Sequence, residues 1–276
     1  MENEIDPLLN RDDELHAENN LLKLKLGLEY GMEMTEVSPL SPDVENHWLK
    51  SVYAWESAYK NAKRVKLYDY IGRPEFPKWD SLTPEQVSRE LERIHTIMEN
   101  NSVHLSSICK YDDTTIYKFI TEELFEHEMD DMRVLGMTCH FTYEEFHPNH
   151  DYEIRERAAD FVRKIFRKQW NQEYDGIILS DKIFFSGATY DRKGISTIVS
   201  TFQDAHSSLR LHKFDTHDVV IEPDYVKASV IADLSAMGKM KDGEKVRYIG
   251  ACSFKLEREY DYWQISDFSI PGFGNR

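Results

Sequence analysis

The chain has 276 residues, enough for one or two domains, and 41% of them are hydrophobic, enough to build buried cores. Its net charge of −16 is uneven: residues 1–175 hold 21 Lys and Arg against 36 Asp and Glu, and residues 176–276 hold 13 against 14. Because an acidic chain without a basic stripe repels phosphate groups, we exclude direct binding to nucleic acid and docking on an anionic membrane.

A helical arm is predicted over residues 1–37. Within it, residues 12–30 carry leucines at helical spacing. An isolated helix of this length is only marginally stable in water, so we expect it to dock on the same chain or on a second subunit. Pro39 and Pro42 then predict a turn, and Asp43 is placed to cap a second helix.

A small acidic α+β domain is predicted over residues 38–150. We expect strands at 65–71, 103–111, 114–120 and from 136 onward, with helices at 83–100 and 122–131. Thr83 and Gln86 form a capping box at the first of these helices, and Asp112-Asp113 is read as a hairpin turn. The resulting βαββαβ order resembles a ferredoxin-like layout in topology alone.

The remaining residues, 151–276, are predicted to form helices and a curved antiparallel sheet. A long helix begins near Asp151 and runs to about Tyr174, with apolar residues at helical spacing. A short strand near residues 183–185 and a helix over residues 195–205 come next. Four long strands follow, at 209–222, 225–234, 246–256 and 262–270.

Alternation with a period of two assigns the side chains of the last strands to opposite faces. In the third long strand, Tyr248, Cys252 and Phe254 share one face, and Ile249 and Ala251 share the other. The last strand is expected to divide into Trp263, Ile265 and Asp267 on one face and Tyr262, Gln264, Ser266 and Phe268 on the other. Since both faces of the sheet carry apolar residues, we expect both to be covered.

The C-terminal pattern resembles the nuclear transport factor 2-like superfamily. The matching segments are GATYDRKG at residues 187–194 and YWQISDFSIPGF at residues 262–273. The resemblance covers residues 152–276 and implies a cone in which a curved sheet wraps a helix and encloses a pocket. Members include isomerases, dehydratases, cyclases, transport factors and dimerisation modules, so the resemblance implies a shape rather than an activity.

Polar side chains on the predicted strands are candidates for acid–base chemistry in the cone. A buried aspartate or histidine can remove a proton beside a carbonyl group while a tyrosine donates to the oxyanion. The candidates are His212, Asp215, His217, Asp233, Tyr248 and Asp267. The same residues fit surface positions on strands, because a sequence does not show burial. Aromatic candidates for contact with a ligand are Tyr262, Trp263, Phe254 and Trp170.

A second group of candidates is histidine-rich. His140, His147 and His150 offer imidazole ligands that suit zinc, iron or manganese. Their spacing matches no standard zinc motif, and a turn with a helix cap explains the last two better. The acidic run at residues 122–131 similarly fits the charged face of an amphipathic helix better than a cation site.

Cysteine usage and missing motifs limit the remaining possibilities. Cys109, Cys139 and Cys252 are far apart and odd in number, which argues against a disulfide framework and for a reducing compartment. No signal-peptide pattern or run of eighteen apolar residues is present, so we expect a cytoplasmic protein. There is no glycine-rich phosphate loop, Gly-x-Ser-x-Gly, Cys-x-x-Cys or His-Glu-x-x-His, so no cofactor is expected.

The leading hypothesis is a non-catalytic binding or assembly module that forms a homodimer through the outer sheet face of the cone, with the acidic domain presenting a partner surface. The alternative is a small-molecule binder, or an enzyme with isomerase- or dehydratase-type acid–base chemistry in the cone pocket. A metal site near residues 140–150 is a third hypothesis. A filled cone favours the first, and an open apolar cavity with a buried acid favours the second.

Overall fold

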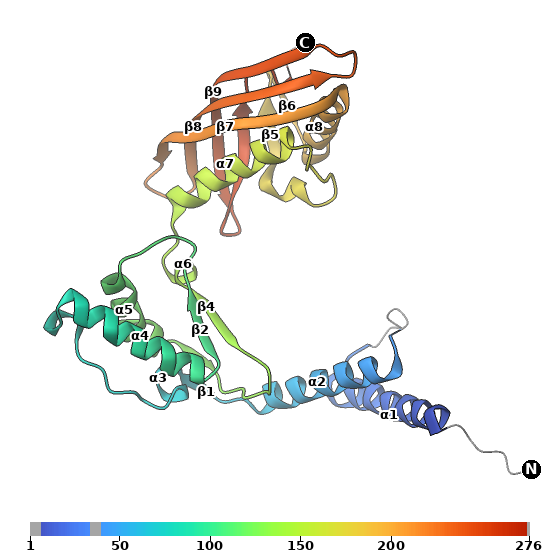
Figure 1. Cartoon of the computed structure of the whole chain (residues 1–276), viewed down its shortest axis with the longest axis vertical. Coiled ribbons are helices and arrows are strands. Elements are labelled where there is room, and N and C mark those ends of the chain that lie inside the picture. The colour runs from blue at the N-terminus through green and yellow to red at the C-terminus, as the bar shows by residue number, and fades with distance from the viewer. Residues whose placement is uncertain (1–6, 34–39, 275–276) are drawn as a thin grey trace, which may run out of the picture. The chain divides into compact units, whose positions relative to one another are not determined.

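The computed structural model describes residues 7–33 and 40–274 of the chain (Figure 1). It divides into two compact units, Met1–Phe146 and His147–Arg276, each with its own hydrophobic core. The three-part division inferred from the sequence stays a prediction. Within the described ranges, every helix is either too short or too polar to span a lipid bilayer.

The first unit begins with two helices, α1 (Pro7–Tyr30) and α2 (Pro42–Asn61), which lie side by side (Figure 1). The amide of Asn46 donates to Oδ1 of Asn19 at 2.9 Å, and both residues are buried in the seam. Near the end of α1, Tyr30 packs edge-on against Tyr53, with ring centroids 5.7 Å apart. Because later residues of α1 meet later residues of α2, the helices run in the same direction. The first helix therefore docks on the same chain.

The rest of the first unit contains short strands and helices around a second core. In chain order these are β1 (Arg64–Lys66), α3 (Leu67–Tyr70), η1 (Trp79–Ser81), α4 (Pro84–Asn100), β2 (Val103–Ser106), α5 (Asp113–Glu122), η2 (Leu124–Glu126), β3 (Glu128–Asp130), β4 (Cys139–Thr142) and α6 (Tyr143–Phe146). The capping box of α4 is confirmed, because Oε1 of Gln86 accepts from the Thr83 N–H at 2.8 Å and the Thr83 side chain accepts from the Gln86 N–H.

Three predicted elements of this region are wrong. The strand expected at residues 65–71 is limited to β1, and the chain then turns into helix α3. Residues 114–120 belong to helix α5 rather than to a strand, and Asp112 caps that helix by accepting from the Thr115 N–H at 2.9 Å. Burial of Tyr117 and Ile120 on one side of α5 outweighs the strand preference of its β-branched residues. The acidic run forms η2 and β3 instead of one helix. In place of one ferredoxin-like sheet there are two small sheets, with β1 antiparallel to β3 and β2 parallel to β4.

The second unit is the predicted cone. Its elements are α7 (His150–Phe166), η3 (Asp175–Ile178), β5 (Leu179–Phe185), β6 (Ala188–Tyr190), α8 (Arg192–Ala205), β7 (His206–Ile221), β8 (Lys227–Met240), β9 (Lys245–Glu259) and β10 (Tyr262–Ser269). The long helix ends at Phe166, short of the predicted Tyr174. The strands form one six-stranded sheet in the order β6-β5-β10-β9-β8-β7, with β10 parallel to β5 and the other pairs antiparallel.

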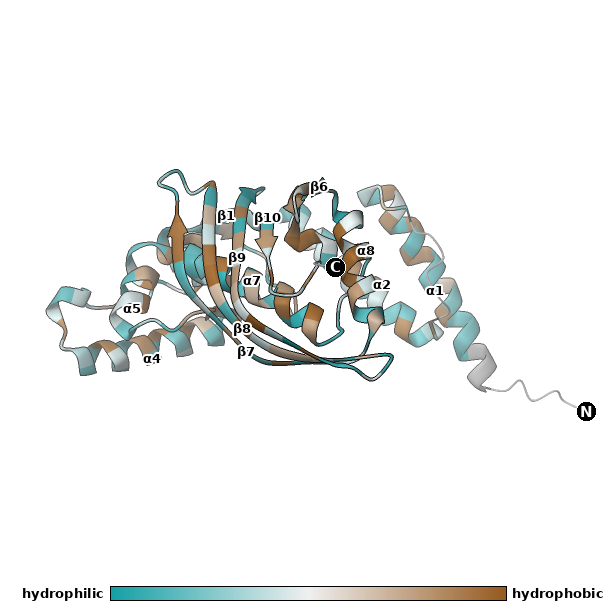
Figure 2. Cartoon of the chain, turned by 90° about the horizontal axis from the view of Figure 1, so that it is seen from above, coloured by the Kyte–Doolittle hydropathy of each residue, from teal (hydrophilic) through white to brown (hydrophobic). Residues whose placement is uncertain are grey.

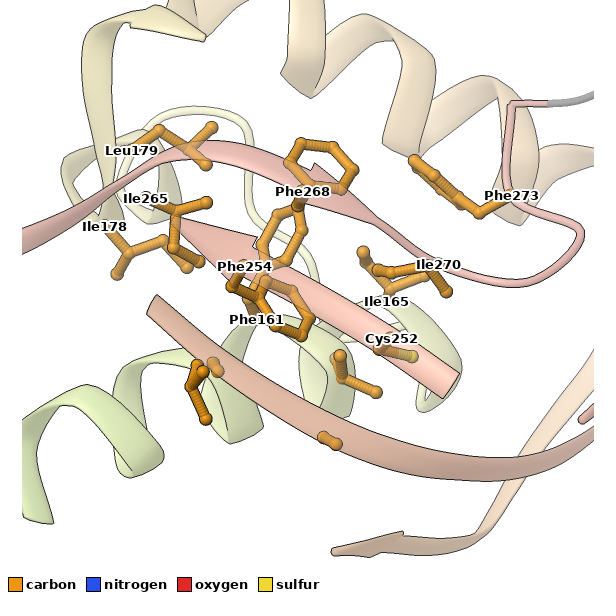
Figure 3. Packing of buried hydrophobic residues seen from close by; sticks show 14 of the residues in the cluster. Phe161, Ile165, Ile178, Leu179, Cys252, Phe254, Ile265, Phe268, Ile270 and Phe273 are labelled. Carbon is orange, nitrogen blue, oxygen red and sulfur yellow. The ribbon is translucent and has the colours of Figure 1, made fainter. Parts of the chain in front are cut away.

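The sheet curves around α7, which gives the unit its nuclear transport factor 2-like cone architecture (Figures 1 and 2). Phe161 and Ile165 of α7, Ile195 of α8, and Phe254 and Ile265 of the sheet belong to one buried core. Figure 3 shows aromatic and aliphatic side chains from α7, β9 and β10 packed together on this concave side. The predicted fold class, α+β with a C-terminal cone, is therefore confirmed.

A β-bulge in β10 changes the predicted faces of that strand. The register shifts between Ile265 and Asp267, so Ser266 is an extra residue. Trp263, Ile265 and Phe268 are buried together, whereas Asp267 pairs with Lys255. The predicted alternation is correct up to Ile265 and wrong beyond it. In β9, by contrast, the two predicted faces are confirmed, and the face with Tyr248, Cys252 and Phe254 is the buried one.

Candidate functional site

The inside of the cone is filled by the chain's own side chains. Trp263 and Phe254 are each 1% exposed, and Trp170 is buried beside Phe161 with ring centroids 5.6 Å apart. Three of the four aromatic ligand candidates are therefore parts of the packed core. Figure 3 shows one of them, Phe254. The fourth, Tyr262, is 65% exposed at the start of β10. The three buried rings are closely packed and therefore stabilise the fold.

His206 and Tyr248 form a buried pair of polar groups on the concave side. His206, the first residue of β7, is 2% exposed, and Tyr248 of β9 is 4% exposed. Their Nε2 and hydroxyl oxygen are 2.6 Å apart, and Nδ1 of His206 is 2.7 Å from the carbonyl oxygen of Phe202. Since a carbonyl only accepts, Nδ1 carries a proton; in the neutral form of the ring, Nε2 is then the acceptor and the Tyr248 hydroxyl the donor.

The surroundings of this pair act on the Tyr248 phenol. Burial raises the pKa of Tyr248 above its usual range, and the charge of Glu244 acts in the same direction. The phenol is therefore a hydrogen-bond donor rather than a phenolate near neutral pH. Gly238 of the neighbouring strand makes room for the imidazole, because a Cβ at this glycine would lie 2.7 Å from Cδ2 of His206.

His206 was not among the candidates read from the sequence. It lies where α8 passes directly into β7, three residues before the predicted start of the strand, and its partner is 42 residues further along the chain. Extending the predicted strand back from Leu209 would not have shown which face His206 lies on. The register shifts between His206 and Ser208, so the alternation with a period of two is broken there.

The other acid–base candidates lie away from the cone interior. Asp215 and Asp233 face each other across the β7–β8 pair, both exposed, and Asp215 forms an ion pair with Lys213. His217 is within 2.9 Å of Asp218 and within 3.7 Å of Asp233. His212 is exposed at a register shift of β7. Asp267 bonds Lys255 at 2.8 Å. The structure thus brings Asp215, His217 and Asp233 together on the outward side of the sheet.

This outward side, which we call the outer sheet face, consists of the side chains of β7, β8 and β9 that point away from the core. It carries exposed apolar residues, with Val220 62%, Ile231 40% and Ile249 63% exposed. Lysine, arginine and aspartate side chains lie among them. A hollow of about 340 Å³ at one end of the face is lined by residues that include Val220, Lys255 and the bulged Ser266.

The histidine candidates for a metal site have individual partners. His140 of β4 lies in the first unit, with Nε2 2.8 Å from the Ser106 hydroxyl. His147 and His150 belong to the second unit, and Nδ1 of His150 accepts from the Trp263 indole at 3.2 Å. Among residues 7–33 and 40–274, no group of three or more His, Cys, Asp or Glu side chains is placed to hold a metal ion.

Comparison with known proteins adds structural likeness but no family membership. No protein-family model matches the chain, and no curated protein matches it. Solved structures that resemble it include the Kfla4162 protein from Kribbella flavida, at 16% identity over 44% of this chain and 88% of that one, with a TM-score of 0.36. A hexachlorocyclohexane dehydrochlorinase from Novosphingobium barchaimii is 15% identical over 46% and 92%, also with a TM-score of 0.36.

A protein of the NTF2-like family from Streptomyces avermitilis is 11% identical over 44% of this chain and 95% of that one, with a TM-score of 0.34. Likenesses at this level carry no argument about activity. The cone itself is recognised from its strand order and from the packing of α7 on the concave side.

Proposed function

We propose that this chain is a cytoplasmic, non-catalytic binding or assembly protein whose cone unit forms a homodimer through the outer sheet face. The observation that carries the proposal is the contrast between the two sides of one sheet. The concave side is filled by buried residues of the chain itself, whereas the other side exposes Val220, Ile231 and Ile249. None of the three cysteines is in a disulfide bond in the described part of the chain, which supports a reducing compartment.

The apolar residues of the outer sheet face lie close enough together to form one contact area. Ile231 on β8 is opposite Ser253 on β9, and Ile249 on β9 is opposite Ser235 on β8. Between these two cross-strand pairs lies the pair of Asp233 and the small Ala251. Small side chains beside exposed isoleucines let another sheet approach closely, and exposed apolar patches of this kind are typical of protein interfaces.

The charges of the outer sheet face favour a second copy of the same chain as its partner. Asp215 and Asp233 are directly opposite each other, an unfavourable arrangement of like charges. Lys213, Arg247 and Lys255 supply positive charge on the same face. In a two-fold contact each chain presents the same patch, so cations of one copy can approach aspartates of the other. Residues 1–175, with 36 acidic against 21 basic residues, are not self-complementary in this way.

One feature favours the alternative function, acid–base chemistry on a small molecule. The imidazole of His206 and the phenol of Tyr248 are groups that such chemistry uses. Both are hydrogen-bonded inside the packed core, so a substrate reaches them only if the aromatic side chains around them move. The filled cone therefore supports assembly over catalysis.

The test is the mass of the full chain in solution, with and without a charge on the outer sheet face. At about 10 µM, where an interface of micromolar Kd is populated, light scattering coupled to size exclusion is expected to give a dimer. Ile249→Asp places a buried charge in the interface and is expected to weaken the dimer by at least about tenfold in Kd, equivalent to about 1.4 kcal/mol.

The matched control is Ile177→Asp, since Ile177 is 68% exposed in the same unit but lies in η3, outside the outer sheet face. This variant is expected to keep the dimer mass. A monodisperse monomer for the unmodified chain would remove the homodimer from the proposal. Equal weakening by both variants would place the interface elsewhere.

A further inference from the structure

A second hollow of the cone unit has no part in the core or in the outer sheet face. It has a volume of about 740 Å³ and lies between residues 172–177 and the first two turns of α8. Its size falls within the range of about 300–1,000 Å³ that is usual for small-molecule sites. Both walls belong to the second unit.

The floor of this hollow has a polar group without a partner. Ser196 is 5% exposed and lines the hollow. The hydroxyls of Thr197 and Thr201 on the same helix donate to carbonyl oxygens four residues earlier, at 2.9 and 2.8 Å. In the described part of the chain the Ser196 hydroxyl has no such bond. A hydroxyl in the lining of a hollow that bonds no protein group can pair with a ligand atom there.

Hydrogen-bond donors predominate around Ser196. Lys193 is exposed, and no carboxylate of the described residues lies within ion-pair distance of its ammonium group. Arg192 approaches Asp181 at 3.2 Å and Gln264 at 3.4 Å through one terminal nitrogen, while its Nε is buried without an acceptor. Glu173 is the one carboxylate in the lining of this hollow. The excess of donors favours a ligand rich in acceptors.

The end of the helix is not itself the binding group. Oδ1 of Asp191 already accepts from the Gly194 N–H at 2.7 Å, so the first turn of α8 is capped by the chain. The acceptor-binding groups are the side chains of Lys193 and Ser196, which lie three residues apart and therefore on one side of the helix.

The wall formed by residues 172–177 includes the polar Gln172 and Glu173 and also exposes two large apolar side chains. Tyr174 is 67% exposed and Ile177 is 68% exposed, with Gly176 between them. A tyrosine ring and an isoleucine side chain left in water beside a hollow are typical of a surface that contacts an apolar group. The ligand that matches both walls has an anionic head and an apolar body.

We propose that this hollow binds a small organic acid, with its carboxylate on Lys193 and Ser196 and its apolar body against Tyr174 and Ile177. The site is independent of the proposed homodimer. Its residues lie on η3 and α8 and the segment before η3, whereas the outer sheet face is built from β7, β8 and β9.

The test is a titration of the isotope-labelled full chain with benzoate, an aromatic carboxylate, and with benzamide, a neutral molecule of nearly the same shape. Benzoate is expected to shift the backbone amide signals of residues 172–177 and 192–197. Benzamide is expected to bind at least about tenfold more weakly than benzoate, because it lacks the charge that Lys193 attracts. Lys193→Gln and Ser196→Ala are each expected to weaken benzoate binding by about fivefold to tenfold.

Two controls separate binding from folding. Lys182→Gln removes an exposed lysine of β5 outside the hollow and is expected to leave benzoate binding unchanged. Ser196→Ala is expected to keep the unfolding midpoint unchanged or to raise it, because the lost hydroxyl has no partner to abandon. The proposal is overturned if benzoate and benzamide bind equally well. It is also overturned if benzoate shifts only amide signals outside residues 172–177 and 192–197, or if Lys182→Gln weakens benzoate binding as much as Lys193→Gln does.

Discussion

At the scale of single residues, the His206–Tyr248 pair explains why the cone tolerates an imidazole in its core. Each nitrogen of His206 has one partner, a carbonyl at 2.7 Å and a phenol at 2.6 Å. The neutral ring with its proton on Nδ1 satisfies both contacts, whereas a second proton on Nε2 would meet the proton of the Tyr248 hydroxyl unless that group rotated. The pair therefore fixes one tautomer and joins the end of α8 to the middle of the sheet.

The thiol of Cys252 gives a prediction about pH. Burial raises the pKa of Cys252 from its ordinary value of 9.0 to about 12, and the charge of Asp233 adds to the effect. At pH 8 iodoacetamide is therefore expected to alkylate the half-buried Cys109 and Cys139 before Cys252, and to modify all three in denaturant, as measured by mass spectrometry.

The raised pKa of Cys252 also determines how the free energy of unfolding changes with pH. Since the pKa of Cys252 is higher in the folded chain, the unfolded state loses this proton first as the pH rises. The contribution of the neutral thiol is complete below about pH 9 and is lost between about pH 9 and pH 12. Cys252→Ala is expected to reduce the loss of unfolding free energy over that range. Rapid alkylation of Cys252 in the folded chain would contradict the burial argument.

At the scale of elements, local chemistry was predictable and tertiary packing was not. The capping box of Thr83 and Gln86 depends on residues three apart, so the sequence alone identifies it. Helix α5 depends on burying Tyr117 and Ile120 against distant residues, and its β-branched start indicated a strand. In β10 the extra residue Ser266 depends on pairing with β9, which periodicity does not reveal.

The residues of the candidate site were likewise predictable only where local alternation was regular. Tyr248 was grouped correctly on one face of β9 with Cys252 and Phe254, because that strand alternates without interruption. Its partner His206 lies beside a register shift of β7, as does His212. The choice between pocket and exterior for Asp215 and Asp233 required the position of α7, which the sequence pattern does not give.

The close approach of β7 and β8 gives a prediction for Gly238. A Cβ at this position would lie 2.7 Å from Cδ2 of His206 and 3.1 Å from Cδ2 of Leu209. Gly238→Ala is therefore expected to lower the free energy of unfolding of the second unit by about 1–3 kcal/mol through overpacking. Urea unfolding followed by tryptophan fluorescence measures the change.

Gly176→Ala is the matched control, because its Cβ would lie 3.8 Å from Cβ of Arg192, an ordinary contact distance. This variant is expected to change the free energy of unfolding by less than about 0.5 kcal/mol. If both variants lower the free energy of unfolding by the same amount, the space around His206 is not the reason for a glycine at position 238.

At the scale of the whole molecule, each core draws its buried apolar residues from one unit. The first uses residues between Leu67 and Tyr143, and the second uses residues between Ile154 and Phe273. Separate cores predict separable unfolding, so a single free energy of unfolding does not describe the full chain. The acidic surplus also belongs almost entirely to residues 1–175.

Calorimetry of two core variants tests this separation. Phe161→Ala removes a fully buried ring that contacts Trp170 and Phe268, and Ile94→Ala removes a fully buried side chain of the first core. Each is expected to cost about 2–5 kcal/mol and to lower the melting temperature of its own transition alone. One transition that both variants lower together would show that the two cores unfold as a single cooperative unit.

The position of β10 in the sheet has a consequence for how the cone is made in a cell. β10 is the last strand of the unit along the chain, yet it lies between β5 and β9 and is the link that joins the β5–β6 pair to the β7–β8–β9 meander. While the ribosome is still translating, the nascent chain can form these two pieces but cannot close the sheet before residues 262–269 have emerged. Until then the apolar edges of both pieces are open to chaperones and to other nascent chains, and a premature stop before residue 262 leaves them permanently unjoined.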